Sequence, residues 1–288
     1  MTVPTIPIDE PRRRGRLHHL TVGLGFVLVL LTIVMALVSF IWTPYDPTFV
    51  NANETLDGLG QHGHLLGTDA FGRDTFSQLL VGARVTLLAG IIAVAIAAVV
   101  GVPAGILAGM RARWLGELIM RGNDILFAFP ALLLAILFAA GWGASTWTAM
   151  VAIGISTVPV FARLARASTL QVMTTEYVLA ARAAGRGGWW IARRHVLPNI
   201  ASVLVVQASV AFGLAILAEA ALAYLGLSTQ PPTPSWGRML HDAQGYLFTA
   251  PRLSVWPGIA IGLAVLGFNL LGDGLRDLLD PRLRERRR

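Results

Sequence analysis

Neither cysteine nor lysine occurs in this sequence, and only 14% of its 288 residues are charged. The absence of cysteine excludes disulfides, thiolate metal sites and thiol nucleophiles. The absence of lysine excludes a phosphate-binding P-loop, because that motif needs a lysine to hold the nucleotide phosphates. Hydrophobic residues, by contrast, make up 55% of the chain. So apolar a composition does not suit an ordinary soluble domain, and it indicates an integral membrane protein.

Six apolar stretches could each cross a bilayer, whose hydrocarbon core of about 30 Å needs roughly 20 helical residues. The first is too long for a signal peptide and no small-residue cleavage site follows it, so we expect a retained anchor helix. Only a Gly-Trp-Gly sequence separates the third stretch from the fourth, which favours a tight helical hairpin. The expected spans are residues 20–42, 85–110, 124–140, 146–161, 200–225 and 256–275.

The arginines test this map independently, because cationic residues near the ends of spans are retained on the cytoplasmic side. With the N-terminus inside, nineteen of the 23 arginines fall on inner segments. The other four, Arg73, Arg84, Arg238 and Arg252, fall outside. This asymmetry supports six transmembrane helices with both termini in the cytoplasm. It also explains the net charge of +7 without invoking nucleic acid as a partner.

The expected fold class is therefore all-α and membrane-integral. The two outer segments are rich in Pro, Gly, Asn and Asp, which favours turns and short surface helices over a separate domain. The expected parts are a cytoplasmic tail at 1–19, an anchor helix at 20–42, an extracytoplasmic segment at 43–82, a core with five further transmembrane helices at 83–275 that includes a cytoplasmic loop at 163–198, and a basic cytoplasmic tail at 276–288.

That cytoplasmic loop carries most of the functional information. Residues 175–184 favour a helix with Glu176 near its positive end, and alanines give it a small, flat face. The glycines within 185–188 would end this helix, and residues 189–194 could begin a second, amphipathic one at the membrane interface. Pro198 falls where the next span begins. Two such helices could transmit movement from a soluble partner, although composition alone favours a plain interfacial loop whose arginines only fix topology.

The spacing within the loop changes that balance. Ala180-Ala181, three further residues, Gly185, and then Leu197-Pro198 resemble the loop by which permeases of ATP-binding-cassette (ABC) importers engage their ATPases. Other stretches match the dipeptide and oligopeptide branch of these permeases, in order, over nearly the whole chain. They are residues 64–69, 72–74, 82–84, 219–221, 225–227, 230–237, 269–277 and 280–282. The chain thus resembles the permease subunit, of the second-permease type, of a bacterial dipeptide or oligopeptide ABC importer, a binding-protein-dependent transport system inner membrane component.

The resemblance implies the type I ABC importer permease fold and a multi-pass location in the bacterial inner membrane. It implies a pore shared with a second homologous permease, and as further partners one or two ATPase subunits, an extracytoplasmic substrate-binding protein and the lipid bilayer. ATP and Mg would bind to the ATPases, with no catalytic residue, cofactor or metal in this chain. Leu179 stands where many permeases have glutamate and His195 where many have isoleucine, so a salt bridge from position 179 is not expected. The residues implied in coupling are Glu176, Tyr177, Ala180, Ala181, Arg182, Gly185, Leu197 and Pro198.

Glu219 lies within the fifth expected span, where a carboxylate is costly. It could line the translocation path, or it could pair with Arg84 at the outer end of the second span. The pair is favoured, because an unpaired buried charge is the more expensive arrangement. We therefore expect Glu219→Gln to weaken assembly and folding more than substrate choice, and normal complex yield with changed selectivity would refute this.

None of the six histidines lies in the middle of an expected span, which argues against haem carriers and intramembrane proteases. His62 and His64 could share a metal ion, but two ligands without a carboxylate cluster are more typical of a solvated loop. Four tryptophans fit an outer aromatic belt. They are Trp142, Trp147, Trp236 and Trp256.

Two other classes of protein were weighed against the importer permease. A secondary transporter driven by an ion gradient would show repeated halves, broken helices and central charges. A membrane enzyme would show a polar catalytic set at one depth. Neither pattern is evident in the sequence. The cargo is not fixed, because related permeases serve dipeptides, longer peptides, glutathione and nickel chelates.

Overall fold

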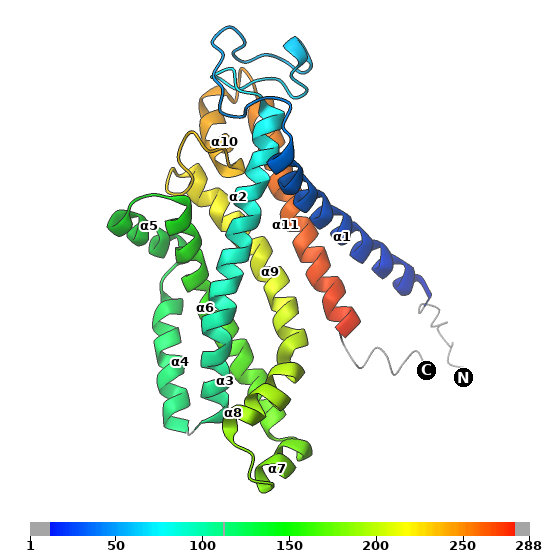
Figure 1. Cartoon of the computed structure of the whole chain (residues 1–288), viewed down its shortest axis with the longest axis vertical. Helices are drawn as coiled ribbons and strands as arrows, with labels where there is room; N and C mark the ends of the chain where they lie inside the picture. The colour runs from blue at the N-terminus through cyan, green and yellow to red at the C-terminus, as the bar shows by residue number, and fades with distance from the viewer. Residues whose placement is uncertain (1–11, 112, 280–288) are drawn as a thin grey trace, which may run out of the picture.

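A computed structural model describes residues 12–111 and 113–279, and within them the chain is helical, with a single isolated β-bridge between Thr68 and Asp74 (Figure 1). The all-α class predicted from the sequence is confirmed. The outermost parts of the two predicted tails, 1–11 and 280–288, lie outside the described residues. The α-helices are α1 Arg12–Ile41, α2 Thr75–Ile96, α3 Val102–Met110, α4 Arg113–Ala128, α5 Ala131–Trp142, α6 Thr146–Met173, α7 Glu176–Ala183, α8 Gly188–Ile191, α9 Leu197–Tyr224, α10 Trp236–Ala243 and α11 Arg252–Leu279.

Five helical runs in the described part of the chain are long and apolar enough to cross a membrane. A sixth results if α4 and α5 are taken together as one span, bent by 83° at the break between them. Together they agree with the six stretches expected from the sequence. The five runs are Thr21–Ile41, Thr75–Met110, Thr146–Met173, Gly188–Tyr224 and Arg252–Leu278.

The third expected span, 124–140, is not one straight helix. α4 ends at Ala128 and α5 begins only at Ala131. Pro130 has no backbone N–H and disfavours helical geometry at Phe129, so the helix stops there and changes direction. α5 contacts α6 after a short connection, but it lies across the direction of α6 (Figure 1), so the tight hairpin expected between the third and fourth spans is not formed.

Three boundaries also differ from those expected. α6 continues to Met173, so the first part of the expected loop 163–198 is still helix. α2 begins at Thr75 with Asp74 as its N-cap, so the last part of the expected outer segment 43–82 is already helix. The amphipathic helix expected at 189–194 is not separate, because a π-helical turn, Ala192–Val196, joins α8 to α9 without a break.

Packing centres on α9, which lies against α2, α6, α10 and α11. On another side of the bundle, α3 and the π-helical turn before it, Ala97–Gly101, pack closely on α6 through Gly101, Gly105 and Gly109. A Cβ atom built on Gly105 would lie 2.3 Å from the carbonyl oxygen of Ala162. The two backbones therefore touch, which is the packing that small residues four apart allow between membrane helices.

The two ends of the molecule are unlike each other (Figure 1). The loops that precede α2 gather with α10 at one end, and α7 forms the tip of the other. The ends of α1 and α11 that lead to the chain termini point toward the α7 half. Because the arginine distribution places both termini inside, α7 lies on the cytoplasmic side.

Candidate functional site

Helix α7 is short, and one residue holds it to the bundle. Val178 has no exposed surface and belongs to the core cluster that contains Ile106 of α3 and Ile200 of α9. Ala181, one turn further along, is half-buried against the same cluster. The sequence analysis did not single out Val178, although an apolar residue three positions before a small one marks an inward-facing stripe.

The other side of α7 is open to solvent. Four of the residues implied in coupling, Glu176, Tyr177, Ala180 and Arg182, are exposed there. Glu176 lies in the first turn and Arg182 in the last, so both charges complement the helix dipole. The exposed surface of α7 therefore carries a charge of the favourable sign at each end, and between these charges Tyr177, Leu179 and Ala180 are accessible to another protein.

The end of α7 is fixed by Gly185. Its φ of 74° lies in the left-handed region, which glycine adopts without a steric penalty. The amide of Arg186 donates to the carbonyl of Ala181 (3.0 Å), and the amide of Gly185 donates to that of Arg182 (2.9 Å). These two bonds form a Schellman motif, so the predicted helix end at Gly185 is present.

An aromatic cluster connects α7 to the segment that follows. The ring of His195 lies 5.5 Å from that of Tyr177 and 5.1 Å from that of Trp190, between ring centroids. The guanidinium of Arg186 lies over the Trp190 ring at 4.9 Å. His195, treated in the sequence as a departure from the common pattern, is here the residue that links α7 to the start of the fifth span.

Leu197 and Pro198 begin α9 and are both exposed. Pro198 occupies the first turn, where its missing N–H leaves no helical hydrogen bond unmade. These two residues thus lie at the start of the span and not on α7 itself.

The expected pair of Arg84 and Glu219 is not formed. Arg84 donates from Nε to the hydroxyl of Ser39 (2.6 Å), and its guanidinium lies over the Phe40 ring. Glu219 is 1% exposed and accepts hydrogen bonds from Ser228 (3.2 Å) and Thr229 (3.4 Å). The sequence could not supply these partners, because they depend on how α1 meets α2 and how the chain turns after α9.

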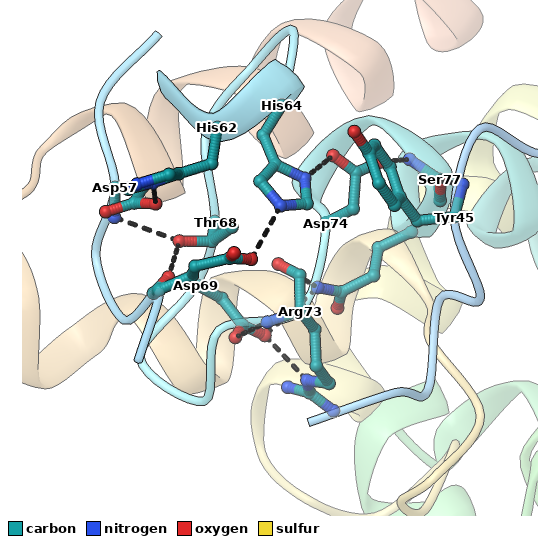
Figure 2. A network of polar contacts seen from close by, with 11 residues as sticks. Tyr45, Asp57, His62, His64, Thr68, Asp69, Arg73, Asp74 and Ser77 are labelled. Carbon is teal, nitrogen blue, oxygen red and sulfur yellow. Dashed lines mark hydrogen bonds and ion pairs between the residues drawn. The ribbon is translucent and has the colours of Figure 1, made fainter. Parts of the chain in front are cut away.

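The outer segment before α2 forms a folded cap held by polar contacts (Figure 2). His64 lies between two carboxylates, with Nδ1 2.9 Å from Asp74 and Nε2 3.2 Å from Glu54. Asp74 also caps α2 by accepting from the amide of Ser77 (2.7 Å). His64 is buried, so the expectation of a solvated histidine loop is wrong at this position.

The same contacts set the protonation of His64. Burial lowers the pKa of His64, but hydrogen bonds and charge from Asp74 and Glu54 together outweigh burial and raise it. His62 bonds Asp57 separately, with Nδ1 2.6 Å from the carboxylate. Within the described residues no group of three or more His, Cys, Asp or Glu side chains could hold a metal ion.

Trp236 differs from the outer aromatic belt that the sequence suggested. It is 1% exposed and donates from Nε1 to the carbonyl of Leu79 (2.9 Å). Its ring covers Gly82, where a Cβ atom would lie only 2.7 Å away. Trp236 therefore anchors α10 to α2, whereas Trp142 and Trp147 are exposed as a belt residue would be.

Taken together, these observations define a polytopic helical membrane protein with a folded outer cap and a small exposed helix at its cytoplasmic tip. A comparison with known protein families leads to the same class of protein. Residues 101–285 match the model of the family described as binding-protein-dependent transport system inner membrane component. The chain belongs to this family, and it is a multi-pass inner-membrane permease component of an ABC importer.

Named relatives cover almost the whole chain. The chain is 42% identical to the glutathione transport system permease protein GsiD of Pectobacterium atrosepticum. The match covers 96% of this chain and 92% of that protein. The chain is 41% identical over 90% of its length to the dipeptide transport system permease protein DppC of Alkalihalophilus pseudofirmus, of which 85% is covered.

Solved structures share the fold. One such structure is the MetNI methionine ABC transporter in an inward facing conformation. The match covers 70% of the present chain and 96% of the MetNI chain. The TM-score is 0.60 and the sequence identity 18%. This likeness establishes the type I ABC importer permease fold that the sequence led us to expect.

Proposed function

We propose that this permease imports peptides in an ATP-driven complex and that α7 couples it to the ATPase. The observation that supports the coupling role is the geometry of α7. One fully buried residue, Val178, anchors a helix on which Tyr177, Leu179 and Ala180 are exposed. A partner that grips these exposed residues would move α7, and the core cluster around Val178 would transmit that displacement to α3, α6 and α9.

The composition of the complex follows from this role. A second homologous permease completes the pore, and one or two ATPase subunits bind ATP and Mg and contact α7. An extracytoplasmic substrate-binding protein delivers cargo at the opposite end, where the outer cap and α10 lie (Figure 1). Hydrolysis takes place in the ATPases, and this chain contributes the transmembrane path.

Peptides are the proposed cargo, because two relatives above 40% identity are named for a dipeptide and for glutathione. Both substrates are short peptides with free termini. Uptake into proteoliposomes that contain the whole complex, with a labelled dipeptide, labelled glutathione and a nickel chelate compared in parallel, tests the cargo. We expect one of the two peptides to be imported in an ATP-dependent manner, and import of the chelate alone would contradict the proposal.

The coupling role is tested by Ala180→Asp on the exposed face of α7. A carboxylate there is solvated in the permease alone but buried and unpaired against the ATPase, which is unfavourable. We expect co-purification of the ATPase to fall and ATP-dependent uptake to be lost, while the permease keeps its yield and melting temperature. Ala52→Asp, at an exposed alanine of the outer segment, is the matched control and retains the ATPase. Full ATPase recovery with Ala180→Asp would refute the proposal.

A further inference from the structure

An apolar cavity of about 480 Å³ lies where α3 ends and α8 begins, beside the coupling region but apart from the exposed face of α7. Its volume falls within the roughly 300–1,000 Å³ of typical small-ligand pockets. Val102, Ile106 and Leu107 of α3 supply one wall, and Trp189 and Leu197 supply the other. Gly188 and Met110 close the space between the two elements, since a Cβ on Gly188 would meet the Met110 side chain at 3.9 Å.

Two arginines stand at the rim of this cavity. Arg111 follows the last residue of α3, and Arg193 lies on the π-helical turn opposite it. A second, adjoining hollow of about 430 Å³ shares Arg193 and adds Arg194. All three side chains are exposed, and none forms an ion pair with another residue in the described part of the chain. The rim therefore presents positive charge with no counter-ion among residues 12–111 and 113–279.

The cavity lies at the inner end of a membrane-spanning run. Its wall on α3 belongs to the apolar run Thr75–Met110, and Val102 lies about 12 Å further into that run than Met110, at about 1.5 Å per helical residue. This run has 36 residues, more than the roughly 20 that cross the hydrocarbon core, so a cavity at its inner end is expected near the headgroup level of the inner leaflet. Trp189, 81% exposed at the mouth, has the amphipathic ring that favours the level of the lipid headgroups.

We propose that this cavity binds an anionic phospholipid of the inner leaflet. One acyl chain lies along Ile106 and Leu107, and the phosphate lies between Arg111 and Arg193. The guanidinium groups supply the planar, multiple donors that suit phosphate oxygens. The bound lipid would bridge the end of α3 and the segment that leads from α7 into α9. This inference depends on membrane insertion and not on the identity of the cargo.

Lipid binding to the purified, delipidated complex tests the proposal. Native mass spectrometry with added phosphatidylglycerol or phosphatidylcholine measures selectivity, and we expect phosphatidylglycerol to bind more tightly. The double variant Arg111→Gln/Arg193→Gln should weaken phosphatidylglycerol binding roughly 25-fold, because each basic residue at an anionic surface contributes about a factor of five. The matched control Arg121→Gln/Arg276→Gln removes two exposed cytoplasmic-side arginines that do not line the cavity, and should leave binding unchanged.

A second readout locates the lipid. Phosphatidylglycerol with brominated acyl chains quenches nearby tryptophan, and we expect Trp189→Phe to remove a distinct fraction of that quenching. Equal binding of the two lipids, or wild-type affinity in the double variant, would overturn the proposal. So would a double variant that loses the second permease or the ATPase while it keeps its lipid, since the cavity would then be a protein contact.

Discussion

His64 is the residue whose chemistry is most clearly set by its surroundings. Glu54 and Asp74 each face one of its ring nitrogens, and the ring of Tyr45 lies 4.3 Å from it between centroids (Figure 2). A protonated imidazolium donates to both carboxylates at once, whereas a neutral ring donates to only one. The protonated form thus joins the outer loop to the start of α2.

This arrangement makes the stability of the outer cap depend on pH. The pKa of His64 is raised in the folded protein, so its contribution is complete below about 6.5, the unfolded value, and is lost as pH rises through the folded pKa. We expect the melting temperature of the purified protein to fall as pH rises from about 6.5 to 9. His64→Gln should flatten this dependence and the exposed control His62→Gln should keep it; a wild-type slope in His64→Gln would contradict the assignment.

Glu219 is the second residue with a defined environment. The buried hydroxyls of Ser228 and Thr229 both donate to it, so Glu219→Ala would remove the acceptor of both, although Thr229 keeps the hydroxyl of Thr146 at 3.1 Å. Each orphaned donor costs about 1–3 kcal/mol. We expect thermal unfolding to show a clear loss of stability in Glu219→Ala and a smaller one in Glu219→Gln, which keeps an acceptor oxygen. Equal melting temperatures for wild type and Glu219→Ala would show that these bonds do not stabilise the fold.

Among the elements, α3 and α6 approach each other backbone to backbone. Gly105→Ala places a methyl group 2.3 Å from a backbone oxygen, and no side-chain rotation can relieve that clash. The two helices would have to separate, and the core cluster shared with Val178 would loosen. We expect a reduced yield of folded protein and a melting temperature lower by several degrees. Gly262→Ala on α11, where a Cβ has open space, is the control and should be neutral. A neutral Gly105→Ala would disprove the close approach.

The ends and breaks of the helices differ in how strongly the sequence signals them. Gly185 has a strong local signal, since a glycine after an alanine-rich run is where a helix ends, and that end is present. The break at Pro130 also has a local signal, since proline disfavours helical geometry at the residue before it. The spacing of Gly101, Gly105 and Gly109, four residues apart, is a sequence signal for close packing of two membrane helices.

Contacts between distant parts of the chain could not be read from the sequence. Trp236 meets the carbonyl of Leu79, far away in sequence, and only the assembled bundle brings the two together. The same holds for Arg84 with Ser39 and for His195 with Tyr177. Hydrophobic periodicity predicts which segments are helices and which face is apolar, but it contains no information about the partner that covers that face.

At the scale of the whole molecule, the permease has a folded outer cap at one end, a bundle centred on α9, and helix α7 at the cytoplasmic tip (Figure 1). The arginine asymmetry gave the orientation of these parts, and the family gave the class of transporter. The central claim is that the exposed face of α7 is covered by an ATPase in the working complex.

Thiol protection tests this claim directly, because the chain has no cysteine and a single introduced one reports alone. Ala180→Cys is reacted with a maleimide in the detergent-purified permease, with and without its ATPase, using partners from which accessible cysteines have been removed. Phe248→Cys, at a fully exposed residue of the outer end, is the control. We predict that the ATPase slows labelling of Ala180→Cys by about tenfold or more, equivalent to roughly 1.4 kcal/mol of protection, and leaves Phe248→Cys unchanged. Equal labelling of Ala180→Cys with and without the bound ATPase would contradict the account.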